Sequence, residues 1–164
     1  MVQATEEHRK LVTEMAIAFD RDVWGQHAPS NAADTKSVAA DKAPQSKEEE
    51  EKAKEAKAKE DAARAAMMTE RITGWLNRGD AFLWREPGEL GLCSLAAFTG
   101  KSPRSARIGC VFTPTQLRGR GLASRLVAAL AQRALDEGRT PCLWTDASNP
   151  TSNKVYERVG FEYV

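Results

Sequence analysis

A short basic turn rich in glycine carries the residues of this sequence best suited to chemistry. It reads Arg118-Gly119-Arg120-Gly121 and stands between an apolar stretch that ends at Pro114 and a stretch with helical periodicity. The first N–H groups of a helix lack partners within the helix and lie at the positive end of its dipole. Glycine lets the backbone approach a ligand closely and adopt a positive φ. This pattern therefore predicts a site for an anion such as a phosphate group.

The sequence around this turn is strongly basic. Between Lys101 and Leu135 there are seven basic residues and no acidic one, whereas the whole chain has a formal net charge of +1. Such a local field favours a polyanionic ligand. Two common phosphate motifs do not fit, because a P-loop needs a lysine after its second glycine and a dinucleotide fingerprint needs a glycine where Ser124 stands.

The turn resembles the pyrophosphate signature of the GNAT superfamily of N-acetyltransferases, [RQ]-x-x-G-x-[GA]. The match occurs in two overlapping frames, which begin at Gln116 and at Arg118. We prefer the second frame, because the apolar face of the helix then begins at Leu122. Downstream, Asn149 is followed seven residues later by Tyr156 and then by Gly160-Phe161, which is similar to the second signature of the family. The resemblance extends from about residue 80 to the end.

The resemblance implies acetyl transfer from acetyl-CoA to a primary amine of a small molecule or protein. In the family, the main chain before the turn pairs with the pantetheine arm, which behaves like an added strand. Main-chain N–H groups of the turn and of the following helix hold the pyrophosphate, and the asparagine lies next to the thiol. By position, the residues implied to bind the cofactor are Val111, Phe112, Thr113, Arg118, Gly119, Arg120, Gly121, Leu122, Ala123, Ser124 and Asn149.

The resemblance also implies that Tyr156 is catalytic and donates a proton to the departing thiolate. A main-chain N–H near Phe112 or Thr113 is our candidate donor to the oxyanion. The attacking amine must also lose a proton, since the pKa of a lysine amine is normally about 10.4. We leave this base unassigned. Asp146 is one candidate, but it could equally contact Asn149 or cap the following helix, and a chain of waters would also serve.

Composition indicates one soluble domain. Hydrophobic residues make up 41% and charged residues 29% of the 164 residues, and no apolar run approaches the roughly 20 residues needed to cross a bilayer. The start lacks a signal-peptide pattern. Two histidines and no cysteine cluster make a metal site unexpected. Cys93, Cys110 and Cys142 stand in apolar runs, which predicts buried free thiols and a cytoplasmic protein, with the nucleus also open.

Helical patterns dominate the N-terminal half. Residues 1–25 hold an amphipathic helix and residues 26–46 a disordered linker. Residues 47–66 form a charged, solvated helix with Glu and Lys or Arg at i and i+4, which favours neither nucleic acid nor a coiled coil. This helix continues into an apolar stripe at Met67, Met68, Ile72, Trp75 and Leu76, ending near Gly79.

Residues 67–164 should form the acetyl-CoA-binding core. Apolar and β-branched runs predict strands over 81–85, 90–98, 106–113 and 142–145, with a final strand opening at Gly160-Phe161. Helices are expected from Leu122 and over Thr151 to Val159. The fold class is α+β of the GNAT kind, with a mixed, mostly antiparallel sheet flanked by helices. We expect no strand before the first helix and none after the last predicted one, as in a shortened member or a fragment.

Several functional alternatives remain open from the sequence. The chain could be a catalytically inactive module that binds CoA or a partner, or an enzyme that transfers a larger acyl group. The acceptor amine is not readable, since a fold and a cofactor site do not determine it. The partners expected are acetyl-CoA and an amine, without nucleic acid or membrane, and a homodimer is possible.

Overall fold

The computed structural model describes residues 1–24, 47–88 and 91–163. The linker predicted over 26–46 lies outside these residues. In chain order the helices and strands are β1 (Val2–Gln3), α1 (Arg9–Trp24), α2 (Lys47–Arg78), β2 (Ala81–Glu86), β3 (Gly91–Lys101), β4 (Ser105–Phe112), α3 (Leu122–Asp136), β5 (Thr140–Leu143) and α4 (Pro150–Val159). Two short 3-10 turns, η1 (Glu6–His8) and η2 (Thr115–Leu117), precede α1 and α3.

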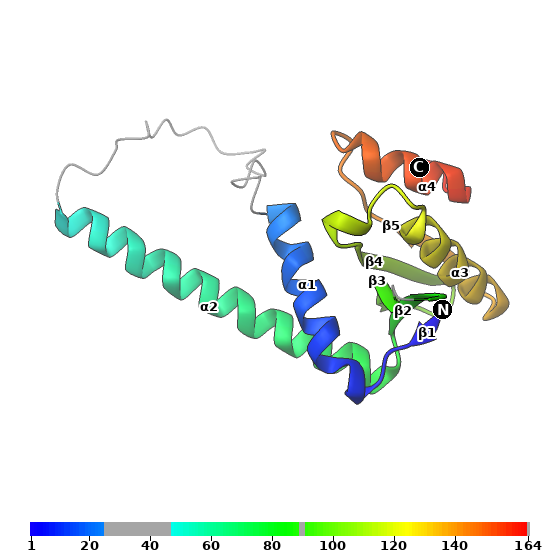
Figure 1. Cartoon of the computed structure of the whole chain (residues 1–164), viewed down its shortest axis with the longest axis horizontal. Coiled ribbons are helices and arrows are strands. Elements are labelled where there is room, and N and C mark those ends of the chain that lie inside the picture. Colours follow the sequence, from blue (N-terminus) through cyan, green and yellow to red (C-terminus); the bar gives the residue numbers. More distant parts are fainter. Residues whose placement is uncertain (25–46, 89–90, 164) are drawn as a thin grey trace.

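The strands form one sheet in the order β1-β2-β3-β4-β5. All neighbouring pairs are antiparallel except β4 and β5, which are parallel because α3 crosses back over the sheet between them. Helices α1 and α2 cover one face, whereas α3 and α4 lie on the other side (Figure 1). The predicted α+β class with a mixed, mostly antiparallel sheet flanked by helices is confirmed.

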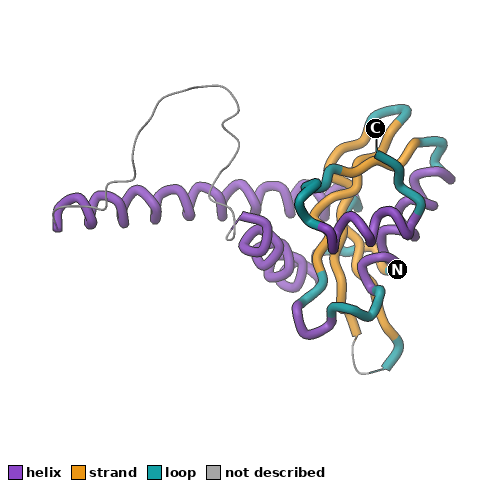
Figure 2. Tube along the Cα trace, turned by 90° about the horizontal axis from the view of Figure 1, so that it is seen from above, coloured by secondary structure: helices purple, strands orange, loops and turns teal. Residues whose placement is uncertain are grey.

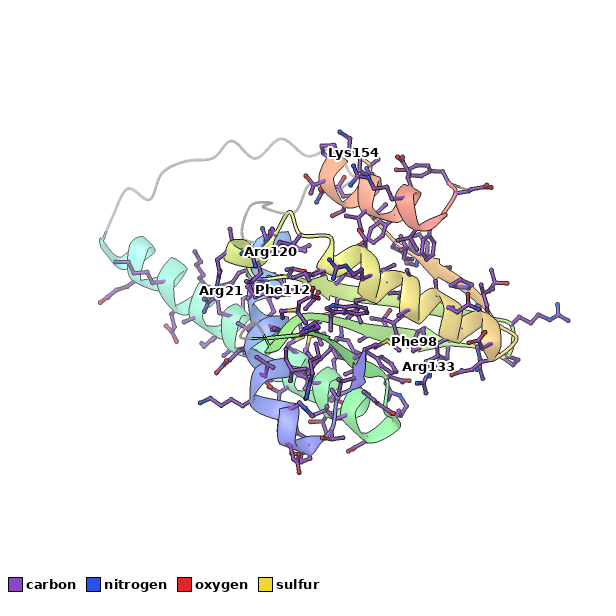
Figure 3. The ribbon with its side chains drawn as sticks, turned by 45° about the vertical axis from the view of Figure 1, so that its right-hand side comes forward. Arg21, Phe98, Phe112, Arg120, Arg133 and Lys154 are labelled. Atoms are coloured by element: carbon purple, nitrogen blue, oxygen red, sulfur yellow. The ribbon has the colours of Figure 1, made fainter. Side chains whose placement is uncertain are left out.

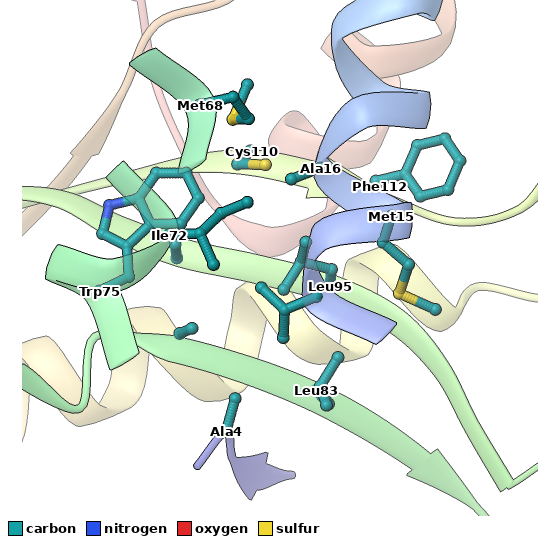
Figure 4. Packing of buried hydrophobic residues seen from close by; sticks show 13 residues of the cluster. Ala4, Met15, Ala16, Met68, Ile72, Trp75, Leu83, Leu95, Cys110 and Phe112 are labelled. Atoms are coloured by element: carbon teal, nitrogen blue, oxygen red, sulfur yellow. The ribbon is translucent and has the colours of Figure 1, made fainter. Parts of the chain in front are cut away.

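Two hydrophobic clusters fill the spaces on either side of the sheet. The first joins α1 and α2 to the sheet and includes Met15, Ile72 and Leu95 (Figure 4). The second lies under α3, where the predicted apolar face is confirmed. On this face of α3, the side chains of Leu122, Leu126, Leu130 and Ala134 are all at most 2% exposed. The helical period of four thus correctly identified the buried side of α3.

Helix α2 is one continuous helix of 32 residues. Its first part projects away from the sheet (Figure 2), and its described side chains up to Met67 are exposed. The predicted ion pairs Lys59–Glu55 and Arg64–Glu60 are present. The predicted stripe is wrong at Met67, which is 65% exposed, because only the side of the helix that carries Met68, Ile72 and Trp75 faces the sheet.

The two ends of the sheet differ from the prediction. A short strand, β1, does precede α1: Val2 pairs with Leu83 and Gln3 with Phe82. Two residues are too few to show an alternating pattern, so this strand could not be read from the sequence. Conversely, Phe161–Tyr163 form no strand in the described residues.

The last residues instead close helix α4. Gly160 adopts a left-handed conformation, and the Phe161 N–H donates to the carbonyl oxygen of Tyr156 at 3.1 Å. Glycine is the usual residue at this position, where the helix ends and the chain reverses. The Gly160-Phe161 pair is therefore a helix stop here rather than the start of a strand.

Strand β5 lies two residues earlier than predicted, at Thr140–Leu143 rather than 142–145. Its position follows from pairing, since the Thr140 N–H donates to the Arg104 carbonyl oxygen at 2.8 Å. Pro141 lies within the strand, which an edge strand tolerates because one side of its backbone needs no ladder partner.

Candidate active site

Strand β5 pairs with only the first half of β4. The parallel register joins Ser105–Ile108 to Thr140–Leu143 and stops there. From Gly109 onward, the edge of β4 that faces β5 has no ladder partner among the described residues. The sheet therefore opens a gap, whose edge is formed by the last four residues of β4.

A β-bulge lies in this open half of β4. Leu95 pairs with Phe112 and Ala97 with Gly109, so β4 has one residue more than β3 between the two pairs. Cys110 takes up the irregularity with a φ of 51°. A bulge of this kind reverses which side chains face which side of the sheet. Accordingly, Ile108 lies in the cluster under α3, whereas Phe112 lies in the cluster with α1 and α2.

Buried hydroxyl groups hold the end of β4. Ser94 Oγ on β3 donates to the Phe112 carbonyl oxygen at 2.9 Å and lies 2.9 Å from Thr113 Oγ1. Since the single Ser94 proton goes to Phe112, the Thr113 hydroxyl must donate to Ser94. The Phe112 carbonyl thus points toward β3. Successive main-chain groups of a strand point in opposite directions, so the Val111 carbonyl and the Thr113 N–H point into the gap.

The basic turn follows β4 after the short 3-10 turn η2 and leads into α3. Gly119 and Gly121 have φ values of 78° and 73°, in the left-handed region. A Cβ added at either position would meet no atom within 4 Å, so backbone conformation rather than space requires glycine there. Gly121 is the N-cap of α3, and the first turn of that helix contains no acidic residue. The N–H groups of Leu122, Ala123 and Ser124 lie in this first turn.

The two arginines of the turn differ in their surroundings. Arg118 is occupied: its Nε donates to the Thr113 carbonyl oxygen at 2.9 Å, its Nη2 pairs with Asp22 on α1, and its guanidinium lies 5.8 Å from the Phe112 ring centroid. The Arg120 side chain is exposed, makes no hydrogen bond or ion pair with another described residue, and lies on the turn close to the Phe112 end of β4 (Figure 3). Arg118 therefore connects the turn to β4 and α1, and Arg120 is the arginine that is available to an anion.

On the opposite side of the gap, Asn149 is the N-cap of α4. Its Oδ1 accepts a hydrogen bond from the Ser152 N–H at 3.1 Å. Asp146 Oδ1 accepts from the N–H and the hydroxyl of Ser148, and the Asp146 carbonyl oxygen accepts from the Asn149 N–H at 3.0 Å. The Asp146 carboxylate therefore contacts Ser148 in the loop before α4, its main-chain carbonyl contacts Asn149, and the base stays unassigned.

Asn153 is a buried polar residue beside the candidate site that sequence reasoning missed. Its side chain is 8% exposed and donates to the carbonyl oxygens of Asp146 and Ala147, and it accepts from the Thr145 hydroxyl. One buried amide therefore holds the loop between β5 and α4. A polar residue one helical turn after the N-cap was the available signal.

Tyr156 follows on α4 and is partly buried. Its ring packs edge to face on Phe161, with 6.3 Å between centroids, in the cluster under α3. Burial raises the pKa of the Tyr156 hydroxyl above its usual 10.0. This hydroxyl makes no hydrogen bond with another described residue. Every buried side-chain polar atom among these residues has a partner, so the unpaired Tyr156 hydroxyl must be accessible to solvent. A protonated, unpaired hydroxyl of this kind can donate a proton.

The three cysteines are free thiols in different surroundings. Cys93 and Cys110 are buried as predicted, and burial raises the pKa of Cys110 to about 12. The prediction is wrong for Cys142, which is exposed, because it alternates with the inward-packed Leu143 on the edge strand β5. Among the described residues, no three acidic, histidine or cysteine side chains are grouped to hold a metal, and no helix is long and apolar enough to cross a membrane.

Comparisons with known proteins agree with this geometry. Residues 89–164 match the family model of FR47-like proteins. A solved probable acetyltransferase is 17% identical and superimposes with a TM-score of 0.63, covering 99% of this chain and 89% of its own. AAC(6')-Iy, solved in complex with the bisubstrate analog CoA-S-monomethyl-acetylneamine, is 18% identical with a TM-score of 0.54 and the same two coverages. No curated protein is significantly similar in sequence.

A putative GNAT acetyltransferase from Novosphingobium aromaticivorans is 31% identical over half of this chain, with a TM-score of 0.45. The present chain spans 36% of the length of that relative. Residues 89–164 carry an FR47-like sequence, and the superposition of the whole described chain shows the fold of the GNAT acetyltransferases. The resemblance inferred from the two sequence signatures is confirmed.

Proposed function

We propose that this protein transfers an acetyl group from acetyl-CoA to a primary amine. The observation that carries the proposal is the open edge of β4, which ends at a glycine turn and the N-terminus of α3. The main chain of Val111 would bind an amide of the pantetheine arm as an added strand does, and the Thr113 N–H would face the thioester carbonyl. The N–H groups from Gly119 to Ser124, together with Arg120, would bind the pyrophosphate.

In the reaction, the amine nitrogen attacks the thioester carbonyl, an N–C bond forms and the C–S bond breaks. The carbonyl oxygen gains negative charge in the tetrahedral intermediate, and the Thr113 N–H is the donor that would stabilise it. The Thr113 carbonyl oxygen is not directed at the oxyanion, because it already accepts a hydrogen bond from Arg118 Nε. Tyr156 would protonate the sulfur as it leaves.

The Asn149 side chain has one group engaged within the protein and one group left for the cofactor. The Asn149 side-chain oxygen caps α4, so the amide nitrogen of this residue is the group that would meet the cofactor. AAC(6')-Iy was solved with a bisubstrate analog that joins CoA to an amine-derived group. This supports an amine acceptor here, while the particular amine is left to experiment.

Calorimetric titration with acetyl-CoA, CoA and a long-chain acyl-CoA, followed by thiol release against a panel of amines, tests the proposal. We expect saturable binding of acetyl-CoA and amine-dependent release of CoA thiol. Binding without turnover on any amine would instead indicate a CoA-binding module. A preference for the long chain would indicate transfer of a larger acyl group, and absence of binding would refute the cofactor assignment.

A further inference from the structure

A chain of polar contacts connects the end of β2 to the glycine turn. Glu86 is the last residue of β2, and its Oε2 accepts a hydrogen bond from Trp84 Nε1 at 2.8 Å. Arg125, one turn into α3, places Nη1 at 2.9 Å from both carboxylate oxygens of Glu86. The carboxylate is thus held by an indole on one side and a guanidinium on the other.

Arg125 also contacts the main chain of the glycine turn. Its Nη2 donates to the carbonyl oxygen of Arg120 at 3.1 Å. No peptide bond among the described residues is cis. In a trans peptide the C=O and N–H point in opposite directions, so holding the Arg120 carbonyl toward Arg125 directs the Gly121 N–H away from it. Gly121, whose φ is 73°, is the N-cap of α3, so this N–H lies directly before the first turn of the helix.

We propose that Glu86 and Arg125 are positioning residues that orient the Arg120–Gly121 peptide so that the Gly121 N–H can bind a phosphate oxygen. This inference rests on the proposed function, since the anion is the pyrophosphate of CoA. Neither side chain contacts the cofactor in this role. Glu86 holds Arg125, Arg125 holds the Arg120 carbonyl, and the peptide presents its N–H.

A competing role for Arg125 is direct binding of phosphate, and the two roles predict opposite results when Glu86 is changed. As a direct ligand, Arg125 would be partly neutralised by Glu86, so Glu86→Gln would free it and tighten CoA binding. As a positioning residue it needs Glu86, so Glu86→Gln weakens binding. The ion pair is partly exposed, with side chains 48% and 23% accessible, so its loss should not unfold the protein.

The experiment is calorimetric titration of CoA, inorganic pyrophosphate and pantetheine into the wild type, Glu86→Gln, Arg125→Gln and the double variant. We expect the dissociation constants for CoA and pyrophosphate to rise about tenfold in each single variant, as for the loss of one charge-assisted hydrogen bond. Pantetheine, which lacks the phosphates, should bind unchanged. The double variant should be no weaker than either single one, because both residues act through the same peptide.

Glu137→Gln is the matched control. Glu137 is also a carboxylate paired with arginines, Arg133 and Arg139, at the other end of α3, where Figure 3 labels Arg133. Its change should leave CoA affinity unaltered. Arg125→Lys tests geometry in addition, because a lysine cannot bridge Glu86 and the Arg120 carbonyl as a guanidinium does, so it should not restore affinity.

Tighter or unchanged CoA binding in Glu86→Gln would overturn the inference, as would an equal loss in Glu137→Gln. A wild type that binds neither CoA nor pyrophosphate would overturn it together with the cofactor assignment. If the wild type binds CoA, the Glu86→Gln loss is seen, and no amine is acetylated, the positioning role stands and only the proposed reaction fails.

Discussion

Tyr156 is the residue on which the proposed chemistry depends most. Its ring is packed against Phe161, so Tyr156→Phe retains the packing and removes only the hydroxyl. We expect kcat to fall roughly 10²-fold, as for loss of a general acid, with little change in acetyl-CoA affinity. Single-turnover thiol release, measured where chemistry limits the rate, checks this. Equal rates in the two proteins would leave Tyr156 with a packing role alone.

The protonation state of Tyr156 gives a prediction about stability and pH. Burial raises the pKa of its hydroxyl above 10.0 in the folded protein, so folding favours the protonated form. The resulting stabilisation is present below the pKa of the unfolded chain and is lost as pH rises through the folded value. Urea denaturation from pH 8 upward should therefore show the wild type losing stability relative to Tyr156→Phe only in the alkaline range. Parallel curves throughout would contradict the assigned burial.

Two substitutions at Gly121 distinguish the effect of backbone conformation from the effect of charge at the proposed phosphate site. Its φ of 73° is a conformation that asparagine and aspartate tolerate better than other side chains. Gly121→Asp and Gly121→Asn are nearly isosteric, and an aspartate favours the positive end of α3. We expect both variants to fold, and Gly121→Asp to bind CoA at least about tenfold more weakly than Gly121→Asn because of charge repulsion. Equal affinities, measured by calorimetry, would place the pyrophosphate elsewhere.

Among the elements, α2 divides into a half that packs and a half that does not. Ile72 is fully buried in the cluster with α1, whereas Met67, five residues earlier, is 65% exposed. Ile72→Ala should lower the free energy of unfolding by about 2 to 5 kcal/mol, because it leaves a cavity. Met67→Ala should change it by less than about 0.5 kcal/mol. A large loss in Met67→Ala, measured by urea denaturation, would show that this part of α2 is covered in solution.

Strand β4 shows how one element serves two purposes. Its first half is an ordinary ladder strand between β3 and β5, and its second half carries a bulge and an open edge. The bulge lets Phe112 pack under α1 while the main-chain groups of Val111 and Thr113 face the gap. Ser94 and Arg118 then occupy the carbonyls of Phe112 and Thr113, so the Thr113 N–H is left as a donor.

At the scale of the whole molecule, the gap between β4 and β5 should be visible in amide hydrogen exchange. Ala106 and Ile108 lie between two paired strands, whereas the edge of β4 at Val111 and Thr113 is unpaired on the β5 side. Acetyl-CoA should slow exchange at Val111 and Thr113 by pairing with them, and should leave Ala106 and Ile108 nearly unchanged. Protection confined to other strands would contradict the proposed binding mode.

Much of this architecture was predictable from local pattern. The period of four in α3, the glycine turn before it, and the apolar runs of β2, β3 and β4 are signals within a few residues, and the structure contains each of them. The two signatures of the family are equally local, and they were sufficient to indicate the fold. The site residues they imply lie at the gap, the turn and the start of α4, where their roles stay predictions.

The tertiary structure decided what depends on partners far away in the sequence. The sequence alone could not show that Arg118 is occupied by Asp22, or that Arg125 is held by Glu86, because these contacts join segments 96 and 39 residues apart. Strand β1, the position of β5 and the exposure of Cys142 likewise follow from which strands pair and which edge stays open. The residue types by themselves determined that a basic glycine turn would precede a helix, and they predicted that it binds an anion, while long-range packing determined which of its arginine side chains is left unpaired.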